Sequence, residues 1–342
     1  MKKLKNILFL IGIAAVILMI LTFRVSFVEM WQHLCHAGFW LLPIFGMWIL
    51  LYLLNALTWR IIILGSGPCP LSFLRLFQIT ISGFALNSAT PIGLMGGEPY
   101  KIMEATPSLG AERATSSVVL FAMMHIFAHF WYWITAVVLY VLFVPMDSVM
   151  YVILPLMALF CGAGVYLFTR GYKNGMMLRV IGLVAHIPGL RGWAVRFRES
   201  HRVQLSNIDS QIAHLHGQDR RNFYLTFLLE YLGRLCHSFE IFFMLRLSGV
   251  EGSFAQLFLY SLLILAFTSL FANLLFFIPM QLGGREGGFA MSIMKVLGSS
   301  MGSKEAMTIA IFISIICRVR EILWTTVGVL LMKCSVTRTP NR

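Results

Sequence analysis

Charged side chains are scarce in this chain of 342 residues, since Asp, Glu, Lys and Arg together make up only 12% of it. A soluble domain carries about twice that share of charge. The hydrophobic fraction of 58% and the mean hydropathy of +0.81 are also too high for one. Several apolar runs approach or exceed the roughly 20 residues that a helix needs to cross a hydrocarbon core. The composition therefore predicts an all-α, polytopic integral membrane protein.

Motifs for metals and nucleotides are also missing. The six cysteines are scattered without a CxxC pair, so they predict neither a disulfide framework nor a metal centre. No GxxxxGK[ST] sequence is present, so we expect no P-loop nucleotide site. His125 and His129 stand four apart without the glutamate of HExxH and without a third ligand. We therefore predict no metal and no other cofactor.

Basic residues outnumber acidic ones, 27 to 14, which gives a net charge of +13. They flank the apolar runs and do not line a soluble domain, so they predict membrane orientation and attraction to anionic lipids at the cytoplasmic surface, not nucleic-acid binding. The basic segment 170–221 and both termini are accordingly placed in the cytoplasm, the termini on the strength of Lys2, Lys3, Lys5, Lys333, Arg338 and Arg342.

We predict about six full spans, at about 5–23, 40–64, 115–143, 149–169, 222–247 and 306–331. Two further apolar segments, 72–98 and 255–298, are interrupted by Pro and Gly. Because successive spans alternate in direction, the segment 72–98 must enter and leave the membrane on the cytoplasmic side, and the segment 255–298 must do so on the outer side. Both are thus predicted to be re-entrant hairpins. The chain then divides into two membrane repeats of inverted topology, 1–147 and 148–342, the second including the basic segment.

A phrase repeated in the two interrupted segments supports this division. PIGLMGGE at 91–98 and PMQLGGRE at 279–286 carry Pro, Leu, Gly and Glu at the same relative positions. Proline lacks an N–H, and glycines such as Gly96 and Gly97 can adopt dihedrals that other residues avoid. Each copy is therefore expected to break a helix where protein or a water-filled cavity supplies backbone partners. Glu98 and Pro99 then suit an N-cap and first position of a new helix, whose amides could receive a lipid phosphate.

The predicted substrate site combines both copies with nearby cations. Arg285 could clamp a phosphate with its planar fork, and Lys101 is the nearest cation to the first copy. The glutamates of the two copies either serve the substrate or a proton, or they only cap helices and neutralise these two cations. The full predicted set is Pro91, Gly96, Gly97, Glu98, Lys101, Pro279, Gly283, Gly284, Arg285, Glu286 and Arg318.

Span 222–247 carries Glu230, Arg234, His237 and Glu240 at spacings of four, three and three, which places them on one stripe facing the bundle interior. This stripe is either a proton path or headgroup contact, or a ladder of salt bridges between helices. The residues predicted as possible coupling groups are Glu98, Glu286, Glu230 and His237.

Two other charged patterns have a functional and a structural interpretation. In the last span, Arg318 and Glu321 are three apart and share a helix face; local pairing and snorkelling are the alternative to a substrate role. Apolar residues recur at roughly helical spacing over 191–221 among several arginines. This pattern predicts a basic amphipathic helix on the cytoplasmic membrane surface, with a plain basic linker as the alternative.

The stretches NSATPIGLMGGEPYK (87–101) and FIPMQLGGREGGF (277–289) resemble the lysylphosphatidylglycerol synthase transmembrane family, the flippase-like domain of the bacterial multiple peptide resistance factor. The resemblance covers essentially the whole chain and implies movement of a lipid, in the best-known members an aminoacylated phosphatidylglycerol, between leaflets of the cell (inner) membrane. Carried over by motif, the residues that line the lipid path would be Gly96, Gly97, Glu98, Gly283, Gly284, Arg285 and Glu286.

One departure concerns the substrate. Bifunctional members carry a cytosolic aminoacyl transferase domain after the membrane part, whereas this chain ends at Arg342, so we expect it not to make an aminoacyl lipid itself. The leading hypothesis is a lipid flippase whose partner is a membrane phospholipid. The alternatives are an integral-membrane lipid-headgroup or polyprenyl-phosphate transferase, with Glu98 or Glu286 as general base, and a non-transporting assembly partner.

Overall fold

The computed structural model describes residues 41–89, 96–171, 191–200, 220–274, 284–298 and 301–334, with isolated residues 39, 182, 185–186, 202, 205–206 and 210. The elements of these segments are all helical, which confirms the predicted fold class. In chain order they are α3 (Leu41–Gly65), α4 (Phe73–Ala89), α5 (Gly97–Leu109), α6 (Ala111–Phe143), α7 (Met150–Gly171), α9 (Arg191–Ser200), α11 (Arg220–Leu247), α12 (Phe254–Leu274), α13 (Gly284–Leu297) and α14 (Ser303–Cys334).

Four described helices are long and apolar enough to cross a membrane, namely α3, α6, α7 and α12. The first three match predicted spans. Predicted spans 222–247 and 306–331 also coincide with continuous helices, α11 and α14. These two helices carry more charge, and several of their charged residues are buried inside the bundle. The predicted span 5–23 lies outside the described residues.

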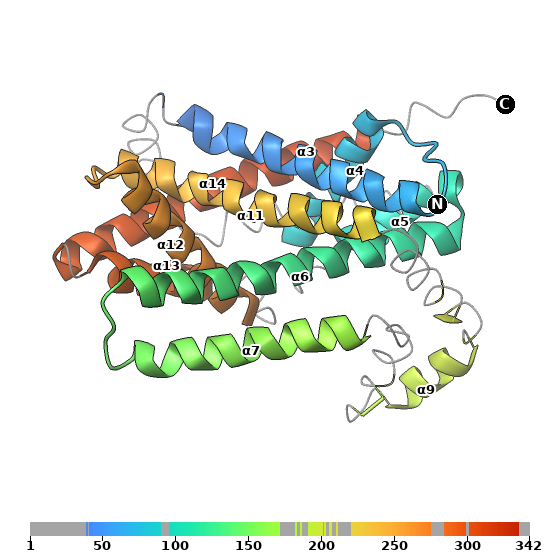
Figure 1. Cartoon of the computed structure of the whole chain (residues 1–342). Coiled ribbons are helices and arrows are strands. Elements are labelled where there is room, and N and C mark those ends of the chain that lie inside the picture. Colours follow the sequence, from blue (N-terminus) through green and yellow to red (C-terminus); the bar gives the residue numbers. More distant parts are fainter. Residues whose placement is uncertain are drawn as a thin grey trace.

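The helix ends gather at two opposite ends of the bundle (Figure 1). At one end, Arg113 at the start of α6 donates to the carbonyl oxygen of Ile63 (2.9 Å) in the last turn of α3. It also donates to Ser66 Oγ (2.8 Å) and to the carbonyl oxygen of Pro68 (2.8 Å), which follow that helix. At the other, Lys295 of α13 pairs with Asp147, between α6 and α7. We name these the Arg113 end and the Asp147 end.

The two interrupted segments form hairpins that open toward opposite ends. The α4–α5 pair packs against α6 near the Arg113 end, and the α12–α13 pair packs together with α13 finishing near Asp147. The predicted boundary of the first hairpin was wrong: its second arm continues beyond residue 98 to Leu109, because Pro99 lies in the first helical turn and Pro107 does not end the helix.

Close helix contact joins α4 to α14. A Cβ atom on Gly328 would lie 2.6 Å from Ala85 Cβ and 2.7 Å from the carbonyl oxygen of Ile81, so only glycine fits without a shift. Ser82 Oγ donates to the carbonyl oxygen of Gly328 over 2.9 Å. This contact holds the C-terminal part of α14 against α4.

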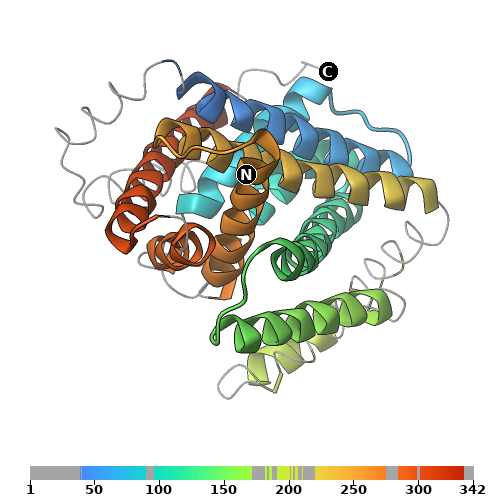
Figure 2. The ribbon, with the colours of Figure 1, turned by 60° about the vertical axis from the view of Figure 1, so that its left-hand side comes forward.

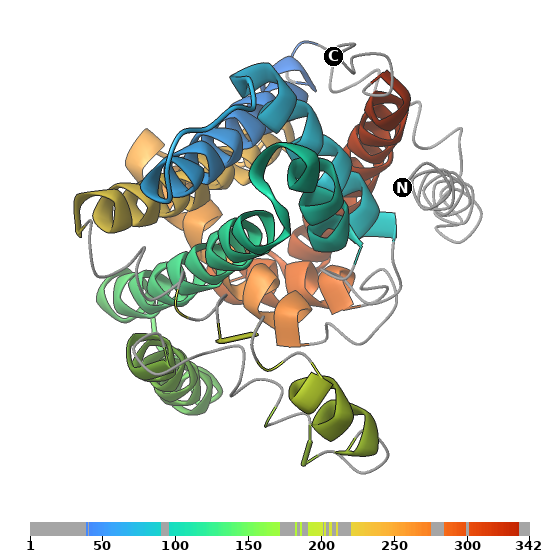
Figure 3. The same cartoon turned by 90° about the vertical axis from the view of Figure 1, so that its right-hand side faces the viewer.

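Helix α7 lies at the edge of the bundle beside α6, as Figures 2 and 3 show from two directions. Its outer face is apolar, with Leu156 60% exposed, which suits contact with lipid. Of the predicted amphipathic segment 191–221, α9 confirms helix over Arg191–Ser200; most of the remainder lies outside the described residues.

Candidate functional site

The second copy of the motif supplies the first turn of α13. Glu286 in that turn accepts hydrogen bonds from Nε (2.8 Å) and Nη2 (2.6 Å) of Arg318, which lies near the middle of α14. The Arg318 side chain is only 5% exposed and that of Glu286 is 38% exposed. A carboxylate in the first turn of a helix is also stabilised by the helix dipole.

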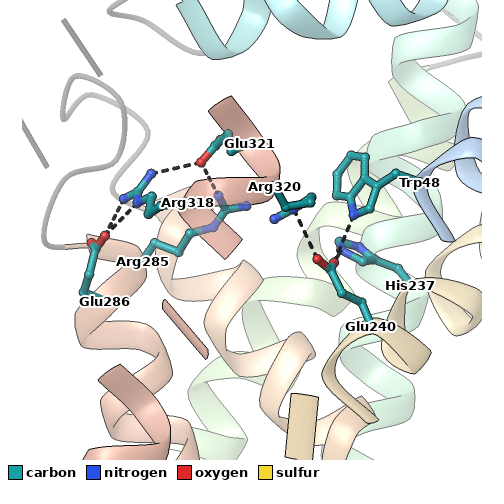
Figure 4. Close-up of polar contacts among 8 residues, drawn as sticks. All are labelled: Trp48, His237, Glu240, Arg285, Glu286, Arg318, Arg320 and Glu321. Carbon is teal, nitrogen blue, oxygen red and sulfur yellow. Dashed lines mark hydrogen bonds and ion pairs between the residues drawn. The ribbon is translucent and has the colours of Figure 1, made fainter. Parts of the chain in front are cut away.

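Arg318 also pairs with Glu321, which in turn pairs with Arg285, as Figure 4 shows. Its Nη1 donates to Glu321 Oε2 over 3.1 Å, and Arg285 Nη1 donates to the same oxygen over 3.0 Å. The predicted pairing of Arg318 with Glu321 is confirmed. Glu286 hydrogen-bonds Arg318 and also attracts its neighbour Arg285 electrostatically, so it contributes to neutralising both cations.

A lateral pocket of about 180 Å³ opens beside the Glu286–Arg318 pair. Apart from this pair, its lining is almost entirely apolar and follows one face of α14 with a contribution from α13: Ala290, Met307, Ala310, Ile311, Ser314 and Ile315. Ile311 is 55% exposed, so the pocket opens to the outside of the bundle. A buried guanidinium at the base of an apolar groove can bind an anionic group that carries a hydrocarbon chain.

A second buried ion pair ties α11 to α14. Glu240 and Arg320 are 1% and 2% exposed, and Arg320 Nε lies 3.2 Å from Glu240 Oε1. Glu240 Oε2 also accepts from Trp48 Nε1 (3.1 Å) and contacts His237 Nε2 (3.0 Å). The Arg320 guanidinium stacks over the Trp48 ring at 4.1 Å. Figure 4 shows this group beside the Arg285 chain.

The first copy of the motif opens α5. Asn87 at the end of α4 accepts a hydrogen bond from the Gly97 N–H (2.7 Å) and donates to Glu98 Oε1 (3.2 Å). The same oxygen lies 3.6 Å from Lys101 Nζ. The predicted neutralisation of Lys101 by Glu98 is therefore present, whereas Asn87 was missed, because a single amide at a helix end has no distinctive pattern.

The two glycines of this copy differ from expectation. Gly96 has ordinary right-handed helical dihedrals, φ −97° and ψ −40°, so the prediction of unusual backbone there was wrong. It is Gly96 and not Glu98 that occupies the N-cap position. Gly97 is required for another reason: its Cβ atom would lie 2.2 Å from the carbonyl oxygen of Gly83 on α4. Close approach of the two arms therefore requires this glycine.

The stripe on α11 faces the bundle as predicted. Glu230 Oε2 lies 2.8 Å from His125 Nδ1 on α6, and Arg234 Nη2 lies 2.7 Å from His125 Nε2. His237 contacts Glu240 on the same helix. These contacts are the interhelical ladder that was one of the two interpretations. His129 contacts the backbone oxygen of His125 (3.0 Å).

The described residues thus contain one network of charges that connects both motif copies. Lys101 interacts electrostatically with Glu230 and His125, which connects the first motif copy to the stripe on α11. Arg320 interacts electrostatically with Glu321, which connects the Glu240–Arg320 pair to the second motif copy. Of the predicted site residues, Gly97, Glu98, Lys101, Gly284, Arg285, Glu286 and Arg318 lie in or beside this network, with Gly96 capping α5, while Pro91, Pro279 and Gly283 lie outside the described residues.

Metal ligands do not gather here: the described part of the chain holds no group of three or more His, Cys, Asp or Glu side chains placed to bind a metal ion. Outside the bundle interior, the Lys295 ammonium hydrogen-bonds Asp147 and lowers the pKa of that carboxyl. This pair is a surface contact at the Asp147 end and not part of the network.

Comparison with known proteins adds the family. No curated protein and no solved structure matches the chain. The sequence model of one family, described as the lysylphosphatidylglycerol synthase TM region, matches residues 8–317, which include every helix described above up to the middle of α14. This chain, a multi-pass membrane protein with a buried charge network, therefore belongs to the lysylphosphatidylglycerol synthase TM region family.

Proposed function

We propose that the protein moves the headgroup of a phosphate-bearing membrane lipid between the two leaflets while the acyl chains stay in the bilayer. The observation that carries the proposal is the lateral pocket, in which the Glu286–Arg318 pair lies at the base of an apolar groove. A phosphate that displaces Glu286 would receive the planar, two-point contact that Arg318 now makes with that carboxylate, and the groove walls offer hydrocarbon contact. Glu286 lies where it can pair with an amine on the same headgroup, such as that of an aminoacylated phosphatidylglycerol.

The order of the helices supports access from both sides of the membrane. Helices α3 to α6 have 25, 17, 13 and 33 residues, and α11 to α14 have 28, 21, 14 and 32. Their hairpins open toward opposite ends (Figure 1). Paired broken helices in inverted repeats are typical of secondary transporters. We therefore propose that 1–147 and 148–342 are inverted repeats with re-entrant hairpins, and that the Arg113 end is cytoplasmic in the cell membrane.

Lipid translocation in proteoliposomes tests this function. Phosphatidylglycerol, lysylphosphatidylglycerol and phosphatidylcholine, each with a fluorescent acyl chain, would be reconstituted separately, and label in the outer leaflet would be reduced chemically over time. Arg318→Gln removes the phosphate ligand, and Ile311→Trp fills the groove without removing a charge. Arg246→Gln, at the exposed end of α11, and Leu156→Trp, on the outer face of α7, are the matched controls.

We expect the wild type to move an anionic or aminoacylated lipid faster than phosphatidylcholine. Arg318→Gln should slow this movement about tenfold or more, the effect of losing roughly one charge-assisted hydrogen bond, and Ile311→Trp should slow it by occupying the groove, while both controls keep the wild-type rate. Equal slowing by the controls, or no lipid movement by folded wild-type protein, would contradict the proposal.

A further inference from the structure

A cluster on α6 and α11 lies away from the lateral pocket and has unused hydrogen-bonding capacity. Glu230 Oε2 is 2.8 Å from His125 Nδ1, while the buried Glu230 Oε1 has no hydrogen-bond partner. Arg234 Nη2 is 2.7 Å from His125 Nε2 and 3.0 Å from Nδ1, and the buried Arg234 Nε has no partner either. The Glu230 side chain is 2% exposed, whereas that of His125 is 28% exposed. His125 is therefore more accessible than Glu230.

The chemistry of the two neighbours fixes the state of the imidazole. An ionised glutamate only accepts hydrogen bonds, so with Glu230 ionised His125 Nδ1 carries a hydrogen that it donates to Glu230. Arg234 Nη2 lies 2.7 Å from Nε2 and 3.0 Å from Nδ1, so the guanidinium lies against the ring and not along the Nε2 lone pair. A neutral imidazole accommodates a cation at this distance, whereas an imidazolium would repel it.

The surroundings favour a proton over a metal cation as the ligand. The groups that face His125 are Glu230, Arg234 and His237 on α11 and Lys101 on α5, together with His129 on its own helix. Two of these are fixed cations, which repel a metal ion. A proton needs only the Nε2 lone pair.

The charge balance of the network makes a proton necessary when an anion enters. The connected network in the described residues holds as many carboxylates as cations: Glu98, Glu230, Glu240, Glu286 and Glu321 against Lys101, Arg234, Arg285, Arg318 and Arg320. A phosphodiester adds one negative charge to this neutral and mostly buried set. Uncompensated charge is costly in a membrane interior.

We infer that His125 is a proton switch that releases Arg234 to bind the phosphate of an anionic lipid headgroup, an inference that rests on the proposed lipid-moving function. A proton from water binds Nε2, and Arg234 moves away because the imidazolium repels a guanidinium that lies 2.7 Å from it. The imidazolium stays paired with Glu230 through Nδ1. Arg234, with Nε already unpartnered, then donates to the phosphate. Loss of the proton restores the Arg234–His125 contact and expels the headgroup.

Proton uptake on lipid binding tests this switch. The protein in phosphatidylcholine nanodiscs would be titrated at neutral pH with dihexanoylphosphatidylglycerol by calorimetry, in two buffers of different ionisation enthalpy. The difference in heat gives the number of protons taken up per lipid bound. His125→Gln keeps a donor toward Glu230 and an acceptor toward Arg234 but cannot be protonated. His129→Gln, one turn away at a histidine whose Nδ1 contacts the backbone oxygen of His125, is the matched control.

We expect the wild type and His129→Gln to take up about one proton per lipid bound. His125→Gln should bind the lipid more weakly and with no linked proton. Lipid binding by the wild type without proton uptake, or unchanged uptake in His125→Gln, would overturn the switch and leave the proposed function standing. Absence of any phospholipid binding or movement by folded protein would overturn both.

Discussion

The Glu240–Arg320 pair should be the strongest single link between α11 and α14. Both side chains are nearly inaccessible, and Arg320 Nε lies 3.2 Å from Glu240 Oε1. At an effective dielectric constant of about 20, two unit charges at this separation attract by about 5 kcal/mol. Removing one member of a buried pair typically costs about 3–5 kcal/mol, because the other charge is left without a partner. Arg320→Met and Glu240→Gln should therefore each lower the free energy of unfolding by about that amount.

A double-mutant cycle measures the link directly. The wild type, the two single variants and the double variant would be unfolded in mixed micelles of a mild detergent and increasing SDS, followed by tryptophan fluorescence. The double variant should lose less stability than the two single variants added together, by about 3 kcal/mol or more. Arg246→Gln on the same helix, where an exposed arginine donates to a loop carbonyl, should change stability by less than about 0.5 kcal/mol. Losses that add to within about 0.5 kcal/mol would refute the reasoning.

Three smaller changes have defined outcomes. Gly328→Ala should destabilise the protein by about 1–3 kcal/mol, because its Cβ would lie 2.7 Å from a backbone oxygen of α4. Gly162→Ala, where a Cβ would meet nothing within 4 Å, should leave stability unchanged. Thermal unfolding in detergent compares the two variants, and equal effects would contradict the packing argument. Asn87→Ala should cost about 1 kcal/mol in the same assay, since it removes the acceptor for the first N–H of α5; an unchanged midpoint would show that this cap contributes nothing. Lys295 lowers the pKa of Asp147, so their contact stabilises the folded state at neutral pH and is lost as the pH falls through that lowered pKa. The stability difference between the wild type and Asp147→Asn should therefore shrink in acid. A stability difference independent of pH would contradict this linkage.

The sequence predicted the parts of the fold that depend on hydropathy and on helix breakers. Long apolar runs marked α3, α6 and α7, and the repeated Pro-Gly phrase marked the two hairpins, because both signals are local. The stripe from Glu230 to Glu240 was also predictable, since charges at helical spacing in a membrane span must face other protein. The beginning of α5 one residue before Glu98 was predicted to within the usual uncertainty of helix ends.

The partners across the bundle were not predictable from the same patterns. Trp48 lies in an ordinary apolar run, and nothing in that run indicates that its indole N–H reaches Glu240, 192 positions away. Arg318 was predicted beside Glu321 because both lie on one helix, but its contact with Glu286 depends on how α13 packs against α14. Interhelical pairs of this kind follow from the tertiary arrangement, which local periodicity does not specify.

The two hairpins are joined to the next long helix by connections of unequal length. Gly110 alone, with φ +78°, separates α5 from α6, whereas positions 298–302 separate α13 from α14. A one-residue joint has only two soft backbone dihedrals, so a tilt of α5 is passed directly to α6 and to His125 upon it. The α13 arm, which carries Glu286, is separated from α14 by more positions and has no such one-residue joint. In the transport cycle that we propose, movement of the first hairpin would therefore be coupled to α6 and, through the His125–Glu230 contact, to α11.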